Sequence, residues 1–213
     1  VVMRCAIAMG LMILTLSGPL WAGDVKDWPF KVYLDDQPVG AHRFRIEEGN
    51  EGLKLMSEAR FKVNFLAIPV YTYDHRSDER WRGNCLTSIQ AKTLDNGTET
   101  RVEGQLANQD FKLSINEGQS GTLPECIMTF AYWNAEMLKK DRLLNPQTGE
   151  WTPVTIRKLG QDSIQVGSAQ QLADHYHLKA EAFDIDLWYD ARGNWLALDS
   201  KLENGSLLRY RLD

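Results

Sequence analysis

The chain has 213 residues, a formal net charge of −5 and 25% charged residues. This small charge of mixed sign argues against a nucleic-acid-binding protein, which needs a basic face, and against simple electrostatic docking on anionic lipid. The length suits one domain with a sizeable core, and no linker, low-complexity tract or fixed-period repeat divides it.

The beginning of the chain has the pattern of a secretory signal peptide, residues 1–22. Arg4 precedes an apolar run, and the stretch "GPLWA" follows with turn-forming and small residues. The apolar run is shorter than the roughly 20 residues of a membrane span. We therefore expect cleavage after Ala22, a single β-rich domain at 23–213 and no transmembrane span after cleavage.

Beyond this segment, apolar and polar residues alternate in many short stretches. In "LKLMSEARFKVNF", residues 53–65, one set of alternate positions is mostly apolar and the other is mostly charged or polar, which is typical of a half-buried strand. The same alternation recurs, between turn signals such as "DNGT" and "ENGS", at Val32–Leu34, His42–Ile46, Cys85–Ala91, Phe111–Ile115, Phe183–Tyr189 and Leu208–Leu212. The sequence predicts a mainly β fold, an antiparallel β-roll or barrel-like meander of about ten to twelve strands.

One stretch, "CIMTFAYWNAEMLKKDRLLNPQTGE" at 126–150, departs from the alternation. We predict two short helical turns in series, at 124–133 and 134–141, with Asn134 as the N-cap of the second. These turns would form one short helical cover over an apolar interior.

The candidate ligand-binding residues lie in this predicted cover. Phe130, Trp133 and Met137 are spaced i, i+3 and i+7, so they share one apolar side of a helix. With the neighbouring Tyr132, they would form a wall of the interior.

Two cysteines, Cys85 and Cys126, remain after removal of the signal peptide. An even number of cysteines in an oxidising compartment suggests one disulfide, which would tie the cover to a strand. The alternative is a pair of buried free thiols. A metal site is disfavoured because no other Cys or His lies near either residue at ligand spacing, and we expect no cofactor.

Two further stretches leave alternatives open. The apolar run "FLAIPVYTYDHR" (65–76) is either ordinary core or an exposed lip. The turn-rich run "NPQTGEWTP" (145–153) either shapes the rim of a site or simply connects the helix to a strand.

The pair "MTFAYWN" (128–134) and "LLNPQTGE" (143–150), together with "LDDQPVGAHRFRI" (34–46), resembles the bacterial family DUF6134. The resemblance covers nearly all of the mature chain. It implies an exported, β-rich bacterial protein, with the periplasm as its location, and it implies no particular activity or site residues.

Candidate catalytic groups fit solvated strand positions better than a reactive centre. His175 and His177 would share one strand face, as would Asp184 and Asp186. A catalytic metal site usually has three protein ligands, however, and the paired aspartates alternate with apolar residues. The G-x-S-x-G, P-loop, G-x-G-x-x-G and H-E-x-x-H motifs are absent from the sequence.

These patterns favour a non-catalytic protein that binds an apolar or lipid-like molecule inside a β-roll. The first alternative is a structural or protein-interaction module of the cell envelope with a solid core and a protein partner. A hydrolase-type enzyme is the third possibility.

Overall fold

The structure, a computed structural model, describes residues 25–65, 68–116 and 118–212. The predicted signal peptide, residues 1–22, and its cleavage point lie outside this part of the chain. Within the described ranges, no helix is long and apolar enough to cross a membrane.

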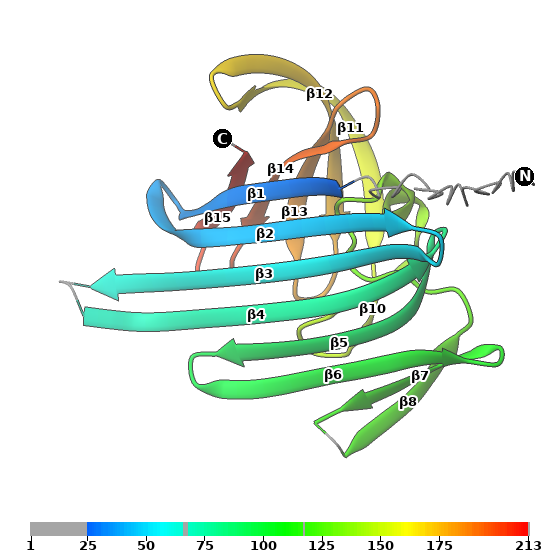
Figure 1. Ribbon diagram of the computed structural model, residues 1–213. Coiled ribbons are helices and arrows are strands. Elements are labelled where there is room, and N and C mark those ends of the chain that lie inside the picture. The colour runs from blue at the N-terminus through cyan, green and yellow to red at the C-terminus, as the bar shows by residue number, and fades with distance from the viewer. Residues whose placement is uncertain (1–24, 66–67, 117, 213) are drawn as a thin grey trace, which may run out of the picture.

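Thirteen antiparallel strands of the described chain form one sheet in the order β11-β12-β13-β14-β15-β1-β2-β3-β4-β5-β6-β7-β8. The bounds are β1 (Val25–Leu34), β2 (Gln37–Gly49), β3 (Gly52–Phe65), β4 (Ile68–Arg82), β5 (Cys85–Asp95), β6 (Thr98–Ala107), β7 (Asp110–Ile115), β8 (Gln119–Pro124), β11 (Thr155–Val166), β12 (Ala169–Lys179), β13 (Asp184–Tyr189), β14 (Trp195–Lys201) and β15 (Leu207–Leu212). Because β1 pairs with both β2 and β15, the first strand lies in the middle of the sheet. The sheet curls into an open roll in which β13 and β14 pass behind the first strands (Figure 1).

The predicted fold class, an antiparallel β-roll, is confirmed, but the strands outnumber the expected ten to twelve. The main sheet has thirteen strands, and two short strands pair separately. The run 65–76 contributes to the ends of β3 and β4, although Leu66 and Ala67 lie outside the described residues. The inward positions of β4 include the polar residues His75, Ser77 and Glu79. This strand therefore does not show the simple alternation of buried apolar and exposed polar residues.

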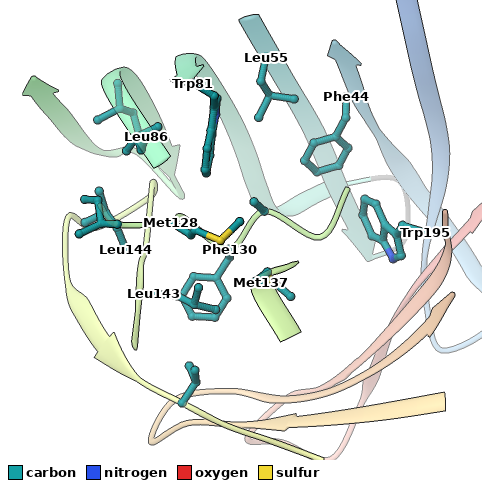
Figure 2. Close-up of a cluster of buried hydrophobic side chains, with 14 of the residues drawn as sticks. Phe44, Leu55, Trp81, Leu86, Met128, Phe130, Met137, Leu143, Leu144 and Trp195 are labelled. Atoms are coloured by element: carbon teal, nitrogen blue, oxygen red, sulfur yellow. The ribbon is translucent and has the colours of Figure 1, made fainter. Parts of the chain in front are cut away.

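A segment of residues 125–154, which we call the inner segment, connects β8 to β11. It contains the 3-10 helix η1 (Ala135–Lys139) and the paired strands β9 (Arg142–Leu144) and β10 (Trp151–Pro153). Its side chains pack inside the roll. Figure 2 shows Phe44, Leu55 and Trp81 of the sheet converging on Met128 and Phe130 of the inner segment.

The expected pair of helical turns is half right. Asn134 caps η1 by accepting a hydrogen bond from the Glu136 amide at 3.1 Å, as predicted. The first turn, at 124–133, was wrong, because this backbone bonds to other segments. The Leu86 amide donates to the Ile127 carbonyl at 2.9 Å, and the Leu144 amide donates to the Met128 carbonyl at 2.9 Å.

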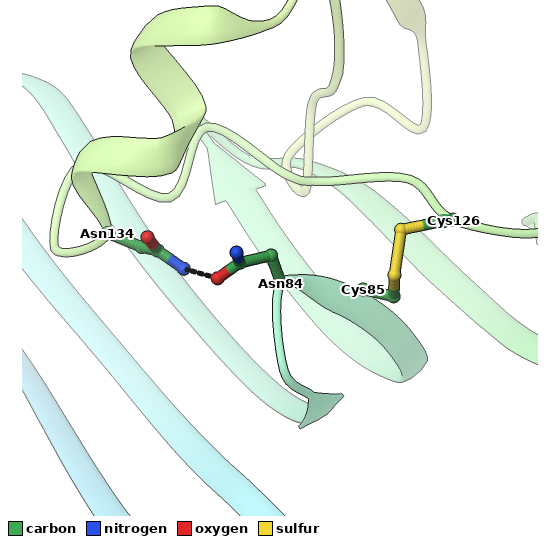
Figure 3. The surroundings of a disulfide bond; sticks show 4 residues. All are labelled: Asn84, Cys85, Cys126 and Asn134. Atoms are coloured by element: carbon green, nitrogen blue, oxygen red, sulfur yellow. Dashed lines mark hydrogen bonds between the residues drawn. A yellow bond between two sulfur atoms is a disulfide. The ribbon is translucent and has the colours of Figure 1, made fainter.

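The predicted disulfide is present between Cys85, at the start of β5, and Cys126 in the inner segment, with 4.7 Å between their Cα atoms. A hydrogen bond of 3.1 Å from the Asn134 side chain to that of Asn84 lies close by (Figure 3). The inner segment is therefore fastened to the β4–β5 hairpin at both its first residues and its helix.

Candidate functional site

A cavity of about 60 Å³ lies between the inner segment and the inward faces of β2, β3 and β4. Phe130, Tyr132 and Trp133, three of the four predicted ligand-binding residues, line it. The fourth, Met137, is fully buried in the core and is not part of the cavity wall. These three residues form one wall of the cavity, and their role in ligand binding stays a prediction.

The opposite wall is polar and comes from rows of residues that face each other across the strands. His42, Ala59, His75 and Thr93 form one row, on β2, β3, β4 and β5. The small side chain of Ala59 separates the two imidazoles, and both histidines line the cavity. A neighbouring position of β3, Ser57, also lines it.

Among the described residues that line the cavity, Glu79 is the only carboxylate, and none is a Lys or an Arg. Its side chain is 3% exposed and accepts hydrogen bonds from Ser77 Oγ at 3.0 Å, Trp81 Nε1 at 2.9 Å and Thr129 Oγ1 at 3.3 Å. Burial raises the pKa of Glu79 to about 7, although these three donors favour the ionised form. The carboxyl group therefore changes charge near neutral pH.

The His75 ring is held in one tautomer by its neighbours. Its Nδ1 lies 2.9 Å from Thr93 Oγ1, and that hydroxyl donates to the Gln147 carbonyl at 3.3 Å. Because a hydroxyl has one hydrogen, both contacts are satisfied when Nδ1–H donates to Thr93. Nε2 then carries a lone pair. Burial, opposed in part by Asp74, lowers the pKa of His75 to about 4, so the ring is neutral at neutral pH.

His42 makes the closest contact between a serine and a histidine at this site. Its Nε2 lies 2.7 Å from Ser57 Oγ, and its Nδ1 lies 3.3 Å from the Tyr210 hydroxyl. A serine beside an imidazole is also the arrangement of a hydrolytic nucleophile and its base. However, burial holds the pKa of His42 well below its usual value, whereas a general base works best with a pKa near the operating pH.

The turn-rich run 145–153 shapes the cavity. The Asn145 side chain accepts a hydrogen bond from the Gln147 amide at 2.9 Å, and the Gly149 amide donates to the Asn145 carbonyl at 2.8 Å. This turn places Asn145, Pro146 and Gln147 in the cavity wall. The stretch thus lines the cavity with these three residues and also connects β9 to β10.

The paired histidines of β12 lie away from this cavity. His175 and His177 share a strand face, as expected, but this is the face that carries Trp188, on which His175 stacks at 4.7 Å. Both rings contact Asp186, at 2.9 and 3.1 Å, and His177 lies 3.5 Å from Asp184. Across the described residues, no group of three or more His, Cys, Asp or Glu has the arrangement of a metal site.

Two larger hollows, of about 800 and 1000 Å³, are lined mainly by charged and polar side chains of the sheet, such as Arg80 and Lys54. The side chains of Arg80 and Lys54 are exposed to solvent. The smaller inner cavity has the convergent polar groups and shifted pKa values that mark a binding site.

Sequence reasoning missed His42, His75 and Glu79. A signal was available in β4, where Tyr73, His75, Ser77, Glu79 and Trp81 occupy every second position and are all buried. Polar residues at the inward positions of a long strand indicate a site inside the roll.

Comparisons with known proteins agree with this architecture. No curated protein matches the sequence. The crystal structure of a beta-barrel-like protein of domain of unknown function DUF1849 from Brucella abortus is similar, with a TM-score of 0.66 and 10% identity, over 90% of this chain and 96% of that chain. This likeness concerns the fold alone. Residues 30–213 match DUF6134, a domain of unknown function, and the chain belongs to this family.

Proposed function

We propose that this protein is an exported, non-catalytic binding protein of the bacterial periplasm that holds an amphipathic, largely apolar ligand on the concave face of its β-roll. The observation that carries the proposal is a continuous row of rings that leads out of the polar cavity. The ligand's polar end would enter the cavity, and its apolar body would lie along the rings.

The row of rings begins at the cavity and runs along the inward face of the sheet. His42 stacks on Phe44 at 4.0 Å between ring centroids and lies 6.4 Å from Phe61. Phe61 stacks on Tyr73 at 5.2 Å and contacts Tyr210 edge-on at 6.3 Å. Aromatic rings give a large apolar contact area for a ligand.

The far end of this row lies on strands that extend past their neighbours. Figure 1 shows the left ends of β3 and β4 reaching beyond those of β2 and β5. Phe61, Val63 and Tyr71, near these ends, are only half-buried. They offer an apolar surface that the inner segment leaves partly open.

The volume of the cavity supports a ligand whose polar end alone enters the cavity. Pockets that enclose drug-sized ligands usually measure about 300–1,000 Å³. A cavity of about 60 Å³ can hold only a small group. An acyl chain would therefore lie outside the cavity, along the rings.

Export is supported by two independent features. The first residues of the sequence have the order of a signal peptide: a positive charge, an apolar run and small residues. The Cys85–Cys126 disulfide suits an oxidising compartment such as the periplasm.

The proposal is tested by native mass spectrometry of the protein isolated from its own cell envelope. We expect a fraction of the molecules to carry one amphipathic molecule that organic extraction releases. The Phe61→Ser, Tyr71→Ser double variant should keep its fold but carry the bound molecule in far fewer copies of the protein. Protein that carries no lipid-like mass, and that also fails to bind added amphiphiles, would contradict the proposal.

A second candidate function is a structural or protein-interaction module. The filled interior favours it, because Met128, Met137, Leu143 and Leu144 are fully buried inside the roll. In the same experiment, this function predicts a protein partner that survives cross-linking in the envelope and no bound small molecule.

A further inference from the structure

Among the described residues the main sheet has two edges, because its outermost strands, β11 and β8, each pair with one neighbour only. A strand at a sheet edge presents unpaired N–H and C=O groups to which another strand can bond. The β8 edge is short and ends at Pro124, which has no N–H to donate. The β11 edge is twice as long, and every residue from Arg157 to Ser163 is exposed. In the described chain, the backbone of β11 bonds to β12 alone.

A β-bulge at Leu159 decides how a further strand can pair with β11. The pairing with β12 continues on both sides of Leu159 but skips this residue. Side chains alternate between the two sheet faces along each half of β11, and the alternation shifts by one residue at the bulge. Lys158 and Gln161 therefore share one face, whereas Arg157 and Asp162 share the other.

A second copy of β11, running antiparallel to the first, carries the same shift. Only one register keeps residues of the same face opposite each other along both halves of the strand. In that register the twofold axis passes through the bulge, and Leu159 of each copy lies opposite Gly160 of the other. Any other register would place residues of opposite faces against each other on one side of the axis.

The side chains at the centre of this register are complementary in shape. Leu159 is a large apolar residue that is 59% exposed. A Cβ atom added at Gly160 would meet nothing within 4 Å, so the space beside this glycine is open. The pairing would therefore bury each Leu159 side chain beside Gly160 of the other copy and remove apolar surface from water.

The same register brings opposite charges together twice. Arg157 lies opposite Asp162 of the second copy, and no described residue forms an ion pair with Arg157. The Asp162 carboxylate accepts a hydrogen bond from Trp188 Nε1 at 3.0 Å and lies 2.8 Å from His175 Nδ1. Since a carboxylate can accept about four hydrogen bonds, and this side chain is 48% exposed, Asp162 can also bind a guanidinium group. Opposite charges that face each other across paired strands stabilise the pairing.

We propose that this protein forms a homodimer in which β11 pairs antiparallel with β11 of a second copy, so that the two sheets become continuous. A twofold axis makes the interface self-complementary, as in most symmetric dimers. This inference is independent of the proposed ligand site, because the β11 edge contributes no residue to the cavity or to the row of rings.

The test is sedimentation velocity of the mature protein, with its disulfide intact, at concentrations from about 1 to about 100 μM. We expect the sedimenting mass to rise from that of one chain to that of two. Amide hydrogen exchange at the two ends of this range locates the interface. At the higher concentration, exchange should slow in β11 and stay unchanged in β8, the other edge strand.

Two substitutions at exposed positions test the register. Leu159→Glu places two carboxylates beside the axis, and Arg157→Asp places a carboxylate opposite Asp162. Each should raise the Kd of the dimer at least about tenfold. The controls Val70→Glu and Arg82→Asp make the same changes of charge at exposed positions of β4 and should leave the Kd unchanged.

Three results would overturn the proposal. The first is a protein that sediments as one chain over the whole range of concentrations. The second is a dimer that shows no slower exchange in β11, and the third is a dimer whose Kd neither Leu159→Glu nor Arg157→Asp changes. Should a variant fail to fold, as judged by circular dichroism, hydrogen exchange of the unsubstituted protein still decides.

Discussion

Thr129 of the inner segment donates a hydrogen bond to Glu79 of β4, with 3.3 Å between Thr129 Oγ1 and Glu79 Oε2. This bond joins the inner segment to the sheet at a carboxylate of the cavity wall. Because the Glu79 carboxyl group is buried and no Lys or Arg of the described chain forms an ion pair with it, its charge state affects the stability of the fold.

Glu79→Gln should change the pH dependence of stability. The folded-state pKa of Glu79 is about 7, above its usual value of 4.5, so the folded state binds this proton more tightly than the unfolded state. The stabilisation is therefore complete below the unfolded pKa and is lost as the pH rises towards 7. The loss amounts to about 3 kcal/mol, and glutamine avoids it because its amide is never ionised.

Denaturant unfolding of both proteins at about pH 5 and about pH 8.5 measures this effect. The parent should lose more stability than Glu79→Gln when the pH is raised from about 5 to about 8.5. The contributions of His42 and His75, whose pKa values are lowered, occur in both proteins and cancel in this comparison. A difference between the two proteins that does not vary with pH would show that Glu79 does not titrate in this range.

The disulfide should contribute strongly to stability. Cys85 and Cys126 are 41 residues apart, and closing such a loop stabilises a protein by roughly 3–4 kcal/mol in the chain-entropy model. The Cys85→Ser, Cys126→Ser double variant should lose about this much in denaturant unfolding. As a control, alkylation of the unfolded, unreduced parent should label neither cysteine. Labelling of both would show that the thiols are free.

Export predicts a defined beginning of the mature protein. Because the signal-peptide pattern ends at Ala22, the first residue after cleavage should be Gly23 or lie within a few residues of it. Mass spectrometry of the N-terminal peptide from a periplasmic extract measures this position. An intact peptide that contains Met3 in that extract would contradict the prediction.

Much of the fold could be predicted because alternation is a local property of the sequence. The strand over 53–65 is one example, and β3 spans Gly52–Phe65. The residues before η1 could not be predicted in this way. Phe130 and Trp133 have helical spacing, but the backbone of 126–133 bonds to Leu86 and Leu144, which are far away in the sequence.

The candidate site was predicted where its residues are neighbours in the chain. Phe130, Tyr132 and Trp133 form a local cluster that composition alone makes conspicuous. His42 and His75 meet only because β2, β3 and β4 pair in a register that places Ala59 between them. A register set by long-range pairing is not visible in a single sequence, so the polar wall was missed.

Phe130 should be important for stability, because it is 9% exposed and contacts Phe183 at 5.3 Å between ring centroids. Phe130→Ala should lower the free energy of unfolding by about 3–5 kcal/mol, the usual cost of removing a buried phenyl ring. Leu172→Ala is a control, since Leu172 is 62% exposed and should change stability by less than about 0.5 kcal/mol. Equal effects of the two substitutions in denaturant unfolding would mean that the inner segment is not part of the core.

Gly52, at the start of β3, should tolerate no side chain. Its φ is +110°, and a Cβ atom there would lie 2.2 Å from the backbone oxygen of Trp81 on the paired strand β4. Gly97 is a matched control, because its φ is +90° but a Cβ atom would meet nothing within 4 Å. Both substitutions to Ala strain the backbone, whereas only Gly52→Ala also pushes β3 away from β4. Thermal unfolding should therefore show Gly52→Ala to be less stable than Gly97→Ala by at least about 2 kcal/mol. Equal stability of the two variants would mean that β3 and β4 do not pair closely at this end, next to the disulfide that fastens the inner segment.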